Sequence, residues 1–150
     1  MEISLRTSFF VLIFVATSAS TLGINCRGSK PNCWSQSGFD DTLETFLHFT
    51  RPGGSLGDSD LYSPGSHIVC RPWGAVPVGG ICAFAQGRNL SPTGINGTMI
   101  RLKLKELVEH GCRTCGTVPL SEDNNPAEAG VLTVNYVLHG PICNGLCHYS

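Results

Sequence analysis

Cysteine is the residue type in this chain whose side chain offers the most possible chemistry. The 150-residue sequence contains eight cysteines, at Cys26, Cys33, Cys70, Cys82, Cys112, Cys115, Cys143 and Cys147. An even number of cysteines in a chain with an export signal indicates a disulfide framework. The count alone does not determine which cysteines pair, so the chemistry of the closely spaced ones has to be weighed motif by motif.

The sharpest local motif is Cys112-Arg113-Thr114-Cys115. A redox-active pair with this spacing normally begins a helix, whose dipole lowers the thiol pKa. Here the pair follows the C-terminus of a predicted helix, which disfavours a thiolate, so a secreted thiol oxidoreductase is not the expected function. A zinc site that combines these cysteines with Cys143 and Cys147 has suitable ligands. In an oxidising compartment, however, disulfides are favoured over zinc.

Cys112 and Cys115 are therefore expected to bond to distant cysteines rather than to each other. Cys26 and Cys33 are suitable partners, and bonding to them would tie an N-terminal segment to the end of a helix. Each such bridge would close a long loop, which in the entropic model stabilises the fold by about 4 to 5 kcal/mol before strain is deducted. Because the two bridges would restrain the same loop, their effects would not add fully.

The N-terminus has the order of a secretory signal peptide. Arg6 supplies a positive charge, residues 9–16 are an unbroken apolar run, and residues 17–21 are small. This order predicts a signal peptide over residues 1–20, cleaved after Ser20, and a single mature domain over residues 21–150. The apolar run is about half the length that spans a bilayer, so no stable membrane insertion is expected. The protein is predicted to be secreted and extracellular.

The overall charge excludes one broad class of partner. The formal net charge is −1, whereas binding to nucleic acid phosphates requires a basic surplus. Nucleic acid is therefore not an expected partner, and general attraction to anionic lipid is disfavoured for the same reason. The sequons at Asn89 and Asn96 predict N-linked glycans on an exported chain.

Two segments are predicted to be helical. Asp41 and Glu44 have the spacing of a capping box before a short helix that buries Leu43, Phe46, Leu47 and Thr50. Residues 98–110 form the stronger prediction, with Ile100, Leu104, Leu107 and Val108 on one face and Gly111 at the C-terminal cap. Arg101, Lys103 and Lys105 point in different directions around this helix, so a solvated helix surface is favoured over a basic binding stripe.

Strands are predicted over residues 67–70, 80–86 and 131–137. In the last segment Leu132, Val134 and Tyr136 alternate with Thr133 and Asn135. Segments rich in glycine, proline and serine, at residues 52–65 and 71–80, are expected to be loops. This order of strands and helices predicts an α+β sandwich, with helices on one face of a mostly antiparallel sheet.

Catalytic signals are poor. Gly57-Asp58-Ser59-Asp60 resembles an esterase nucleophile block only weakly, because no strand precedes it, and a solvated turn is the favoured interpretation. The five histidines lack ligand spacing, and no phosphate-binding or hydrolase motif occurs. Trp34, Trp73 and Tyr62 could form a sugar-stacking platform, although aromatic side chains in separate loops more often fill local packing. The chain is not expected to be an enzyme or to use a cofactor or metal.

Three blocks of the sequence resemble the killer-protein-four family, which comprises a virally encoded killer toxin of smut fungi and its secreted relatives in fungi and mosses. They are residues 22–29 (LGINCRGS), residues 107–116 (LVEHGCRTCG) with Pro119-Leu120 after them, and residues 132–137 (LTVNYV). The blocks occur in the family's order and span most of the predicted mature chain.

The resemblance implies both a fold and an activity. The implied fold is a small α/β sandwich, with antiparallel helices on a five-stranded antiparallel sheet. The implied disulfides are Cys26–Cys112 and Cys33–Cys115. The implied activity is growth inhibition of competing fungal cells by binding a cell-surface protein, with a calcium channel as the target, and without catalysis.

The sequence also departs from the family pattern. Serine replaces a family cysteine in Ser63-Pro64-Gly65, and no cysteine occurs near Arg101. For the remaining cysteines the expected pairs are Cys70–Cys82 and Cys143–Cys147. The lysine important to the family's activity lies two residues before the cysteine that matches Cys70, and here this position is Ile68, next to His67.

Two functions are therefore carried forward. The leading hypothesis is a secreted, monomeric, killer-toxin-like protein with a cell-surface target. The alternative is a non-toxic secreted effector or developmental factor on the same scaffold, favoured by Ile68 at the lysine position and by the near-neutral charge. The residues that would bind a target are left unassigned.

Overall fold

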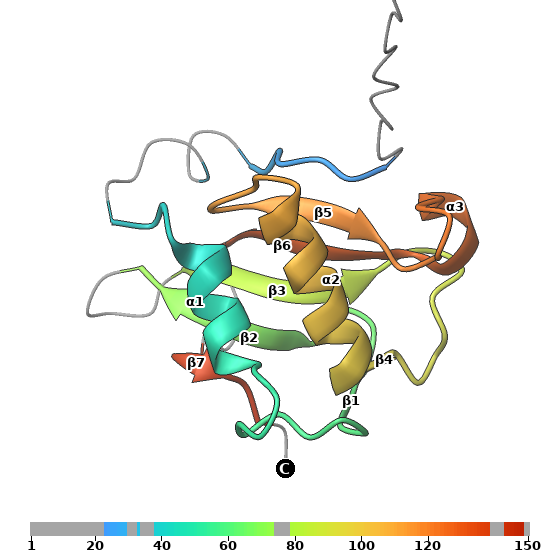
Figure 1. The fold of residues 1–150 in the computed structure, drawn as a ribbon, viewed down its shortest axis with the longest axis horizontal. Helices are drawn as coiled ribbons and strands as arrows, with labels where there is room; N and C mark the ends of the chain where they lie inside the picture. Colours follow the sequence, from blue (N-terminus) through green and yellow to red (C-terminus); the bar gives the residue numbers. More distant parts are fainter. Residues whose placement is uncertain (1–22, 30–32, 34–37, 74–78, 139–142, 149–150) are drawn as a thin grey trace, which may run out of the picture.

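Five antiparallel strands form the main sheet of the described part of the chain, as the computed structural model shows (Figure 1). The structure describes residues 23–29, 33, 38–73, 79–138 and 143–148. The sheet strands are β2 (His67–Pro72), β3 (Gly80–Gln86), β5 (Gly116–Pro119), β6 (Val131–Val137) and β7 (Gly145–Leu146). Their order is β5-β6-β3-β2-β7, and every neighbouring pair is antiparallel. The predicted signal peptide and Trp34 lie outside the described residues.

Helices cover one face of this sheet. They are α1 (Thr42–Phe49) and α2 (Gly97–Glu109), whereas the single-turn α3 (Pro126–Ala129) lies beside β5 and buries none of its residues. Figure 1 shows α1 and α2 side by side and antiparallel in front of the sheet. A small second sheet pairs β1 (Leu61–Tyr62) with β4 (Ile95–Asn96), close to the start of α2. The predicted α+β sandwich with antiparallel helices is confirmed.

Helix α1 forms at the predicted place, but its N-terminus is organised differently. Leu43 and Phe46 are fully buried, and burial of side chains of this size contributes about 1.5 to 3 kcal/mol each. The predicted capping box is wrong, because the Asp41 side chain makes no capping hydrogen bond. Its carboxylate instead pairs with Arg71 on β2, at 2.6 Å. The first turn of α1 is thus attached to the sheet rather than capped locally.

Helix α2 begins one residue earlier and ends one residue earlier than predicted. The Asn96 side chain accepts a hydrogen bond from the Met99 N–H at 2.9 Å, which caps the first turn. At the other end Gly111 has φ +93°. This left-handed conformation lets the N–H groups of Gly111 and Cys112 donate to the carbonyls of Val108 and Leu107. The pattern is a Schellman motif, and it turns the chain sharply into the double-cysteine loop.

The predicted strands are present, and side-chain alternation explains which face each residue occupies. β3 and β6 have the predicted bounds, whereas β2 extends two residues further, to Pro72. Ile81, Ala83, Leu132 and Val134 are fully buried on the helix side of the sheet. The opposite side carries a separate cluster built around Cys70, Cys82 and Cys147, with Phe84, Val137 and Cys143 packed against it. β1, β4, β5 and β7 were not predicted.

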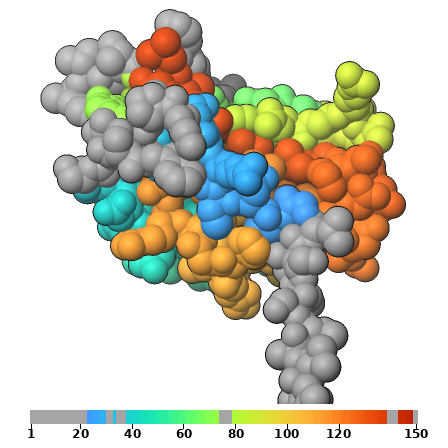
Figure 2. Space-filling model, turned by 90° about the horizontal axis from the view of Figure 1, so that it is seen from above, coloured from blue at the N-terminus to red at the C-terminus, as the bar shows by residue number. Residues whose placement is uncertain are grey.

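The described part of the chain contains four disulfides: Cys26–Cys112, Cys33–Cys115, Cys70–Cys82 and Cys143–Cys147. The first two hold the N-terminal segment, residues 23–29, against the loop that follows α2. Figure 2 shows this blue segment lying directly on orange residues of the α2–β5 region. Asn25 also exchanges two backbone hydrogen bonds with Thr117, which covers the β5 edge of the sheet.

No helix in the described ranges combines the length and the apolar character that crossing a bilayer demands.

Candidate binding surface

The predicted catalytic candidates have structural roles. Asp58 forms an ion pair with Arg101 on α2, and Asp60 accepts a hydrogen bond from the backbone N–H of Gly57 at 2.7 Å. The two carboxylates of the Gly57–Asp60 block therefore shape a loop that packs against the start of α2. This agrees with the expected turn.

The described aromatic residues do not form a common platform. Tyr62 is buried, and its hydroxyl donates to the Cys147 carbonyl at 2.8 Å. Trp73 belongs to a different group, stacked on Phe39 at 5.4 Å between ring centroids and edge-on to Tyr136 at the same distance. Both residues fill local packing, as expected, and the third predicted member, Trp34, lies outside the described residues.

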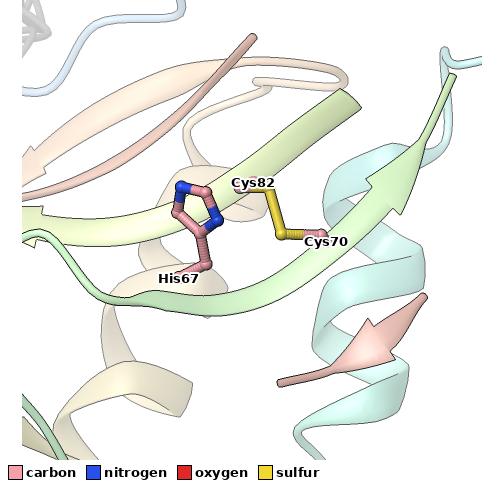
Figure 3. Close-up of side chains that lie close together, drawn as sticks. All are labelled: His67, Cys70 and Cys82. Atoms are coloured by element: carbon pink, nitrogen blue, oxygen red, sulfur yellow. A yellow bond between two sulfur atoms is a disulfide. The ribbon is translucent and has the colours of Figure 1, made fainter. Parts of the chain in front are cut away.

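The cysteines do not supply free thiolates for redox or metal chemistry in this structure. Cys112 and Cys115 belong to two different disulfides rather than forming one pair. Cys70, Cys82 and the His67 ring lie close enough together to resemble a metal site (Figure 3). Since the two cysteines are bonded to each other, their sulfur atoms are not available as thiolate ligands. The zinc set that joined Cys112 and Cys115 to Cys143 and Cys147 is also divided, because these pairs belong to different buried clusters.

The position of the family lysine is not on the surface of this protein. Ile68 is fully buried in the main core. The register of β2 against β3 shifts between His67 and Val69, so Ile68 is the extra residue of a β-bulge, and both Ile68 and Val69 are enclosed. His67 lies at the sheet position opposite Phe84, with 6.2 Å between ring centroids. A side chain at position 68 therefore cannot present a cation to a partner in this fold.

A groove between α1 and α2 is the best candidate for a binding surface. It has a volume of about 320 Å³ and a predominantly apolar lining. Its lining residues come from the C-terminal end of α1, the following turn and the outer side of α2: Leu47, Arg51, Pro52, Thr98, Arg101, Leu102 and Lys105. We refer to these seven residues as the helix groove. Leu102 is 49% exposed, so its side chain contributes apolar surface to the groove.

The helix groove carries three cations and no carboxylate among its lining residues. Arg101 is held in place, because its guanidinium donates to the carbonyls of Thr50 and Leu56 and pairs with Asp58. Lys105 pairs with Glu109 at 2.6 Å, but both side chains are 60% exposed, and such pairs are weak. The third cation, Arg51, contacts the His48 ring at 2.6 Å. An apolar floor is thus bordered by one well-anchored cation, Arg101, and by two on its exposed side.

Lys103 corrects one sequence prediction. The cations of α2 were expected to be solvated, yet Lys103 is only 3% exposed. Its ammonium group is within 3.1 Å of both carboxylate oxygens of Glu106 on the next turn. A buried ammonium is stable only when it is paired, and Glu106 supplies that pairing. Lys103 is therefore part of the packed structure and not of the solvated helix surface. The three α2 cations therefore differ: Arg101 braces a loop, Lys103 is buried, and Lys105 faces solvent.

Two carboxylates have a lowered pKa for local reasons. The pKa of Asp41 is held below its usual value mainly by the hydrogen bond from Arg71. The pKa of Asp123 is lowered first by the Ser121 hydroxyl and then by the Asn125 backbone N–H. Asp41 joins α1 to β2, and Asp123 lies in the turn before α3. Neither carboxylate lines the helix groove.

The two sequon asparagines are both exposed. The Asn89 side chain donates to the Ala127 carbonyl at 2.6 Å, and Asn96 caps α2 through its carbonyl oxygen. The capping atom is the side-chain oxygen, whereas a glycan is attached through the side-chain nitrogen. Glycosylation at these positions stays a prediction.

Sequence analysis missed the helix groove as a site. One signal was present, namely Leu102 on the polar side of an otherwise amphipathic helix, between Arg101 and Lys105. Leu47 comes from α1, and Arg51 and Pro52 come from the turn after it, about fifty residues earlier in the chain. Only the packing of α1 beside α2 brings these residues together.

The sequence profile of the Kp4 family matches residues 9–138. The chain is also 34% identical over 132 residues to the KP4 killer toxin of Ustilago maydis P4 virus, which covers 87% of this chain and 91% of that protein. The residues matched by the family profile include all three helices and four of the five strands of the main sheet. The chain described here therefore belongs to the Kp4 family.

Proposed function

We propose that this protein is a secreted, killer-toxin-like inhibitor that binds a target on the surface of competing fungal cells. The observation that carries the proposal is the 34% identity to a killer toxin over nearly the full length of both chains. The disulfide framework supports export, because such bonds persist in oxidising compartments. The inhibition would require binding alone, since the described residues with catalytic potential have structural roles.

The helix groove is the surface that we assign to target binding. Its apolar floor and exposed Leu102 suit an apolar side chain of the partner, and Lys105, whose exposed pair with Glu109 is weak, suits a carboxylate beside that side chain. The partner surface would therefore be an apolar segment flanked by acidic residues on a membrane protein of the target cell. A calcium channel is the finer target proposal. Because Ile68 is buried, contact would not be made through position 68.

The alternative is a secreted effector without toxicity on the same scaffold. The net charge of −1 and the absence of a cation at position 68 favour it over a toxin that relies on that cation. The two functions differ in one measurement. A toxin arrests the growth of at least one susceptible fungus, whereas an effector binds one defined host protein and leaves growth unchanged.

A growth assay tests the proposal directly. Mature protein secreted from a eukaryotic host is added at micromolar concentration to a broad panel of fungi, while a fluorescent indicator reports calcium entry. We expect growth arrest in a subset of the panel, together with reduced calcium entry. Arrest without a calcium effect would reject the channel but keep the toxin. No arrest anywhere in the panel would contradict the proposed function.

Matched variants test the assigned surface. Leu102→Ser and Lys105→Glu alter the helix groove, and each is expected to raise the half-inhibitory concentration about tenfold, equivalent to about 1.4 kcal/mol of binding free energy. Leu138→Ser is the apolar control, because Leu138 is 53% exposed against 49% for Leu102. Arg88→Glu is the charge control on an exposed loop. Equal loss in groove and control variants would reject this surface.

A further inference from the structure

The far side of the sheet holds two disulfides in contact with each other. Cys70–Cys82 joins β2 directly to β3, and Cys143–Cys147 closes a short loop around β7. The sulfur atoms of Cys147 and Cys70, which belong to different disulfides, are 3.8 Å apart in a buried position. The sulfur atoms of Cys70, Cys143 and Cys147 all lie within 4.8 Å of one another. Four cysteines thus form one continuous group of sulfur atoms.

The four sulfurs differ in their access to solvent. Cys70, Cys82 and Cys147 are between 0% and 4% exposed, whereas Cys143 is half-buried at the edge of the cluster. An external thiol therefore meets Cys143 first. Thiol–disulfide exchange requires a thiolate to reach a disulfide sulfur, and contact between the two disulfides provides this condition inside the protein.

We propose that this group is a thiol–disulfide exchange site whose substrate is a low-molecular-weight thiol such as glutathione. The thiolate of the small molecule attacks the Cys143 sulfur, forms a mixed disulfide there and breaks the Cys143–Cys147 bond. The released Cys147 thiolate attacks Cys70, forms a Cys70–Cys147 bond and breaks Cys70–Cys82. The Cys82 thiolate leaves and takes a proton from water. No net oxidation or reduction of the combined thiols and disulfides occurs, because each step exchanges one disulfide for another.

The surrounding backbone already holds Cys70 in β2 next to Cys147 just after β7, with their sulfur atoms 3.8 Å apart. β7 pairs with β2 through Val69↔Leu146 and Cys70↔Gly145. The Cys147 N–H also donates to the Ile68 carbonyl at 2.8 Å. Because Cys147 is held beside Cys70 by these backbone bonds, the new disulfide needs no rearrangement of strands. The released Cys82 would lie beside the His67 imidazole, as Figure 3 shows for the intact pair.

The exchange would change what the C-terminal cysteines do. In the described structure they join residues separated by four positions, so β7 is attached to the sheet only by noncovalent contacts. After exchange, Cys70–Cys147 would join residues separated by 77 positions and fasten β7 to β2. A small thiol would thus convert a local loop into a long-range cross-link and leave an adduct on Cys143. This inference is independent of the proposed function.

Disulfide mapping of the whole protein tests the proposal. The mature protein is exposed to reduced glutathione for increasing times, quenched with acid, treated with N-ethylmaleimide and digested without reduction. We expect a peptide that links Cys70 to Cys147, glutathione on Cys143 and maleimide on Cys82, all rising together. Cys26–Cys112 and Cys33–Cys115 should remain intact at these times. Glutathione adducts that appear first on Cys26 or Cys33 would overturn the proposal.

Two variants test the second step, and the first of them needs no added thiol. In Cys82→Ser the unpaired Cys70 thiolate can attack Cys147 and release Cys143, so maleimide should label Cys143 and not Cys70. The matched control, Cys70→Ser with Cys82→Ser, should take glutathione on Cys143 but form no cross-link. Persistence of the free thiol on Cys70 in folded Cys82→Ser would contradict the proposal. If that variant does not fold, the time course on the wild-type protein decides alone.

Discussion

The two ends of the chain are held by disulfides of opposite character. The pairs that hold the N-terminal segment, Cys26–Cys112 and Cys33–Cys115, join residues separated by 86 and 82 positions. The other two span only 12 and 4 positions: Cys70–Cys82 in the middle of the chain and Cys143–Cys147 near its C-terminus. We refer to these as the long staples and the short staples. The long staples hold distant elements together. The short staples join residues that one hairpin or turn already brings close.

The long staples are surrounded by interactions that depend on the same arrangement. The Leu43 N–H at the start of α1 donates to the Arg113 carbonyl at 2.9 Å, and the Thr114 hydroxyl donates to the Phe39 carbonyl at 3.1 Å. The loop between Cys112 and Cys115 thus contacts the start of α1 as well as the N-terminal segment. Around the short staples the main support is instead the sheet itself. We therefore expect perturbations at the two sites to differ in size.

Removal of one long staple should have the largest effect. Cys26→Ser with Cys112→Ser is expected to lower the free energy of unfolding by about 3 kcal/mol, because Cys33–Cys115 still closes the long loop and only the smaller ring between the two long staples is opened. Cys143→Ser with Cys147→Ser should cost only about 2 kcal/mol by the same model. Urea denaturation of both double variants measures the difference. Equal losses would show that loop length is not what separates the two kinds of staple.

Crowding the long staples should have the next largest effect. A Cβ atom added at Gly28 would lie 2.7 Å from the Cβ of Cys115, and closer still to the Cys33 sulfur. Gly28→Ala is therefore expected to destabilise the protein by about 1 to 3 kcal/mol through overpacking. Ser29→Ala is the control, because Ser29 is the next residue and its own side chain is exposed. Thermal unfolding monitored by circular dichroism compares the two; unchanged stability in Gly28→Ala would contradict the close packing.

A smaller effect is expected where a side chain supports the short staples. The Tyr62 hydroxyl donates to the buried carbonyl of Cys147 at 2.8 Å. Tyr62→Phe leaves that carbonyl without this donor and should cost about 1 to 2 kcal/mol. Hydrogen exchange should show faster exchange at Leu146 and Cys147, with little change near Cys112. Equally faster hydrogen exchange at all amides would show that the Tyr62 hydrogen bond does not act locally on the short staples.

The smallest effect should come from the ion pair that joins α1 to β2. The lowered pKa of Asp41 arises mainly from its hydrogen bond with Arg71. The contribution of the pair is therefore present above the ordinary carboxyl pKa, near 4, and is lost as pH falls through the lower pKa of the folded state. Asp41→Asn should reduce stability at pH 7 by at most about 0.5 kcal/mol, because the Asp41 side chain is 62% exposed.

The measurement is the difference in unfolding free energy between wild type and Asp41→Asn at several pH values. This difference should be constant above about pH 5 and should shrink towards zero below about pH 3. A difference that grows on acidification would have the wrong sign for a carboxyl with a lowered pKa.

Sequence reasoning succeeded where local pattern and burial agree. Ile100, Leu104 and Leu107 recur at helical spacing, and all three are buried against the sheet. β3 and β6 had the predicted bounds because both are long and lie inside the sheet. The missed strands have two to four residues, which is too short for a repeating pattern to be visible. The Asp41 cap was wrong because a charge on a neighbouring strand competed successfully for its carboxylate.

The candidate site was less accessible to sequence reasoning than the fold. Leu102 and Lys105 are visible on one helix, but a groove also needs the second wall that Leu47 and Pro52 provide. Lys103 and Lys105 are both lysines on α2, yet Lys103 is buried and paired with Glu106. Which cation faces solvent depends on how the helix is rotated against the sheet and on its neighbours, and this is decided by tertiary packing.

The fold class, the main helices and the longest strands could be predicted from the sequence, because they depend on hydrophobic periodicity over several consecutive residues. The family resemblance could also be read there, since it rests on short blocks around Cys26, around Cys112 and in β6. Three features emerge only in the folded protein: Ile68 is enclosed at a β-bulge, α1 and α2 form a groove, and Cys147 touches Cys70. Each of these depends on contacts between residues far apart in the chain, and no local pattern encodes such a contact.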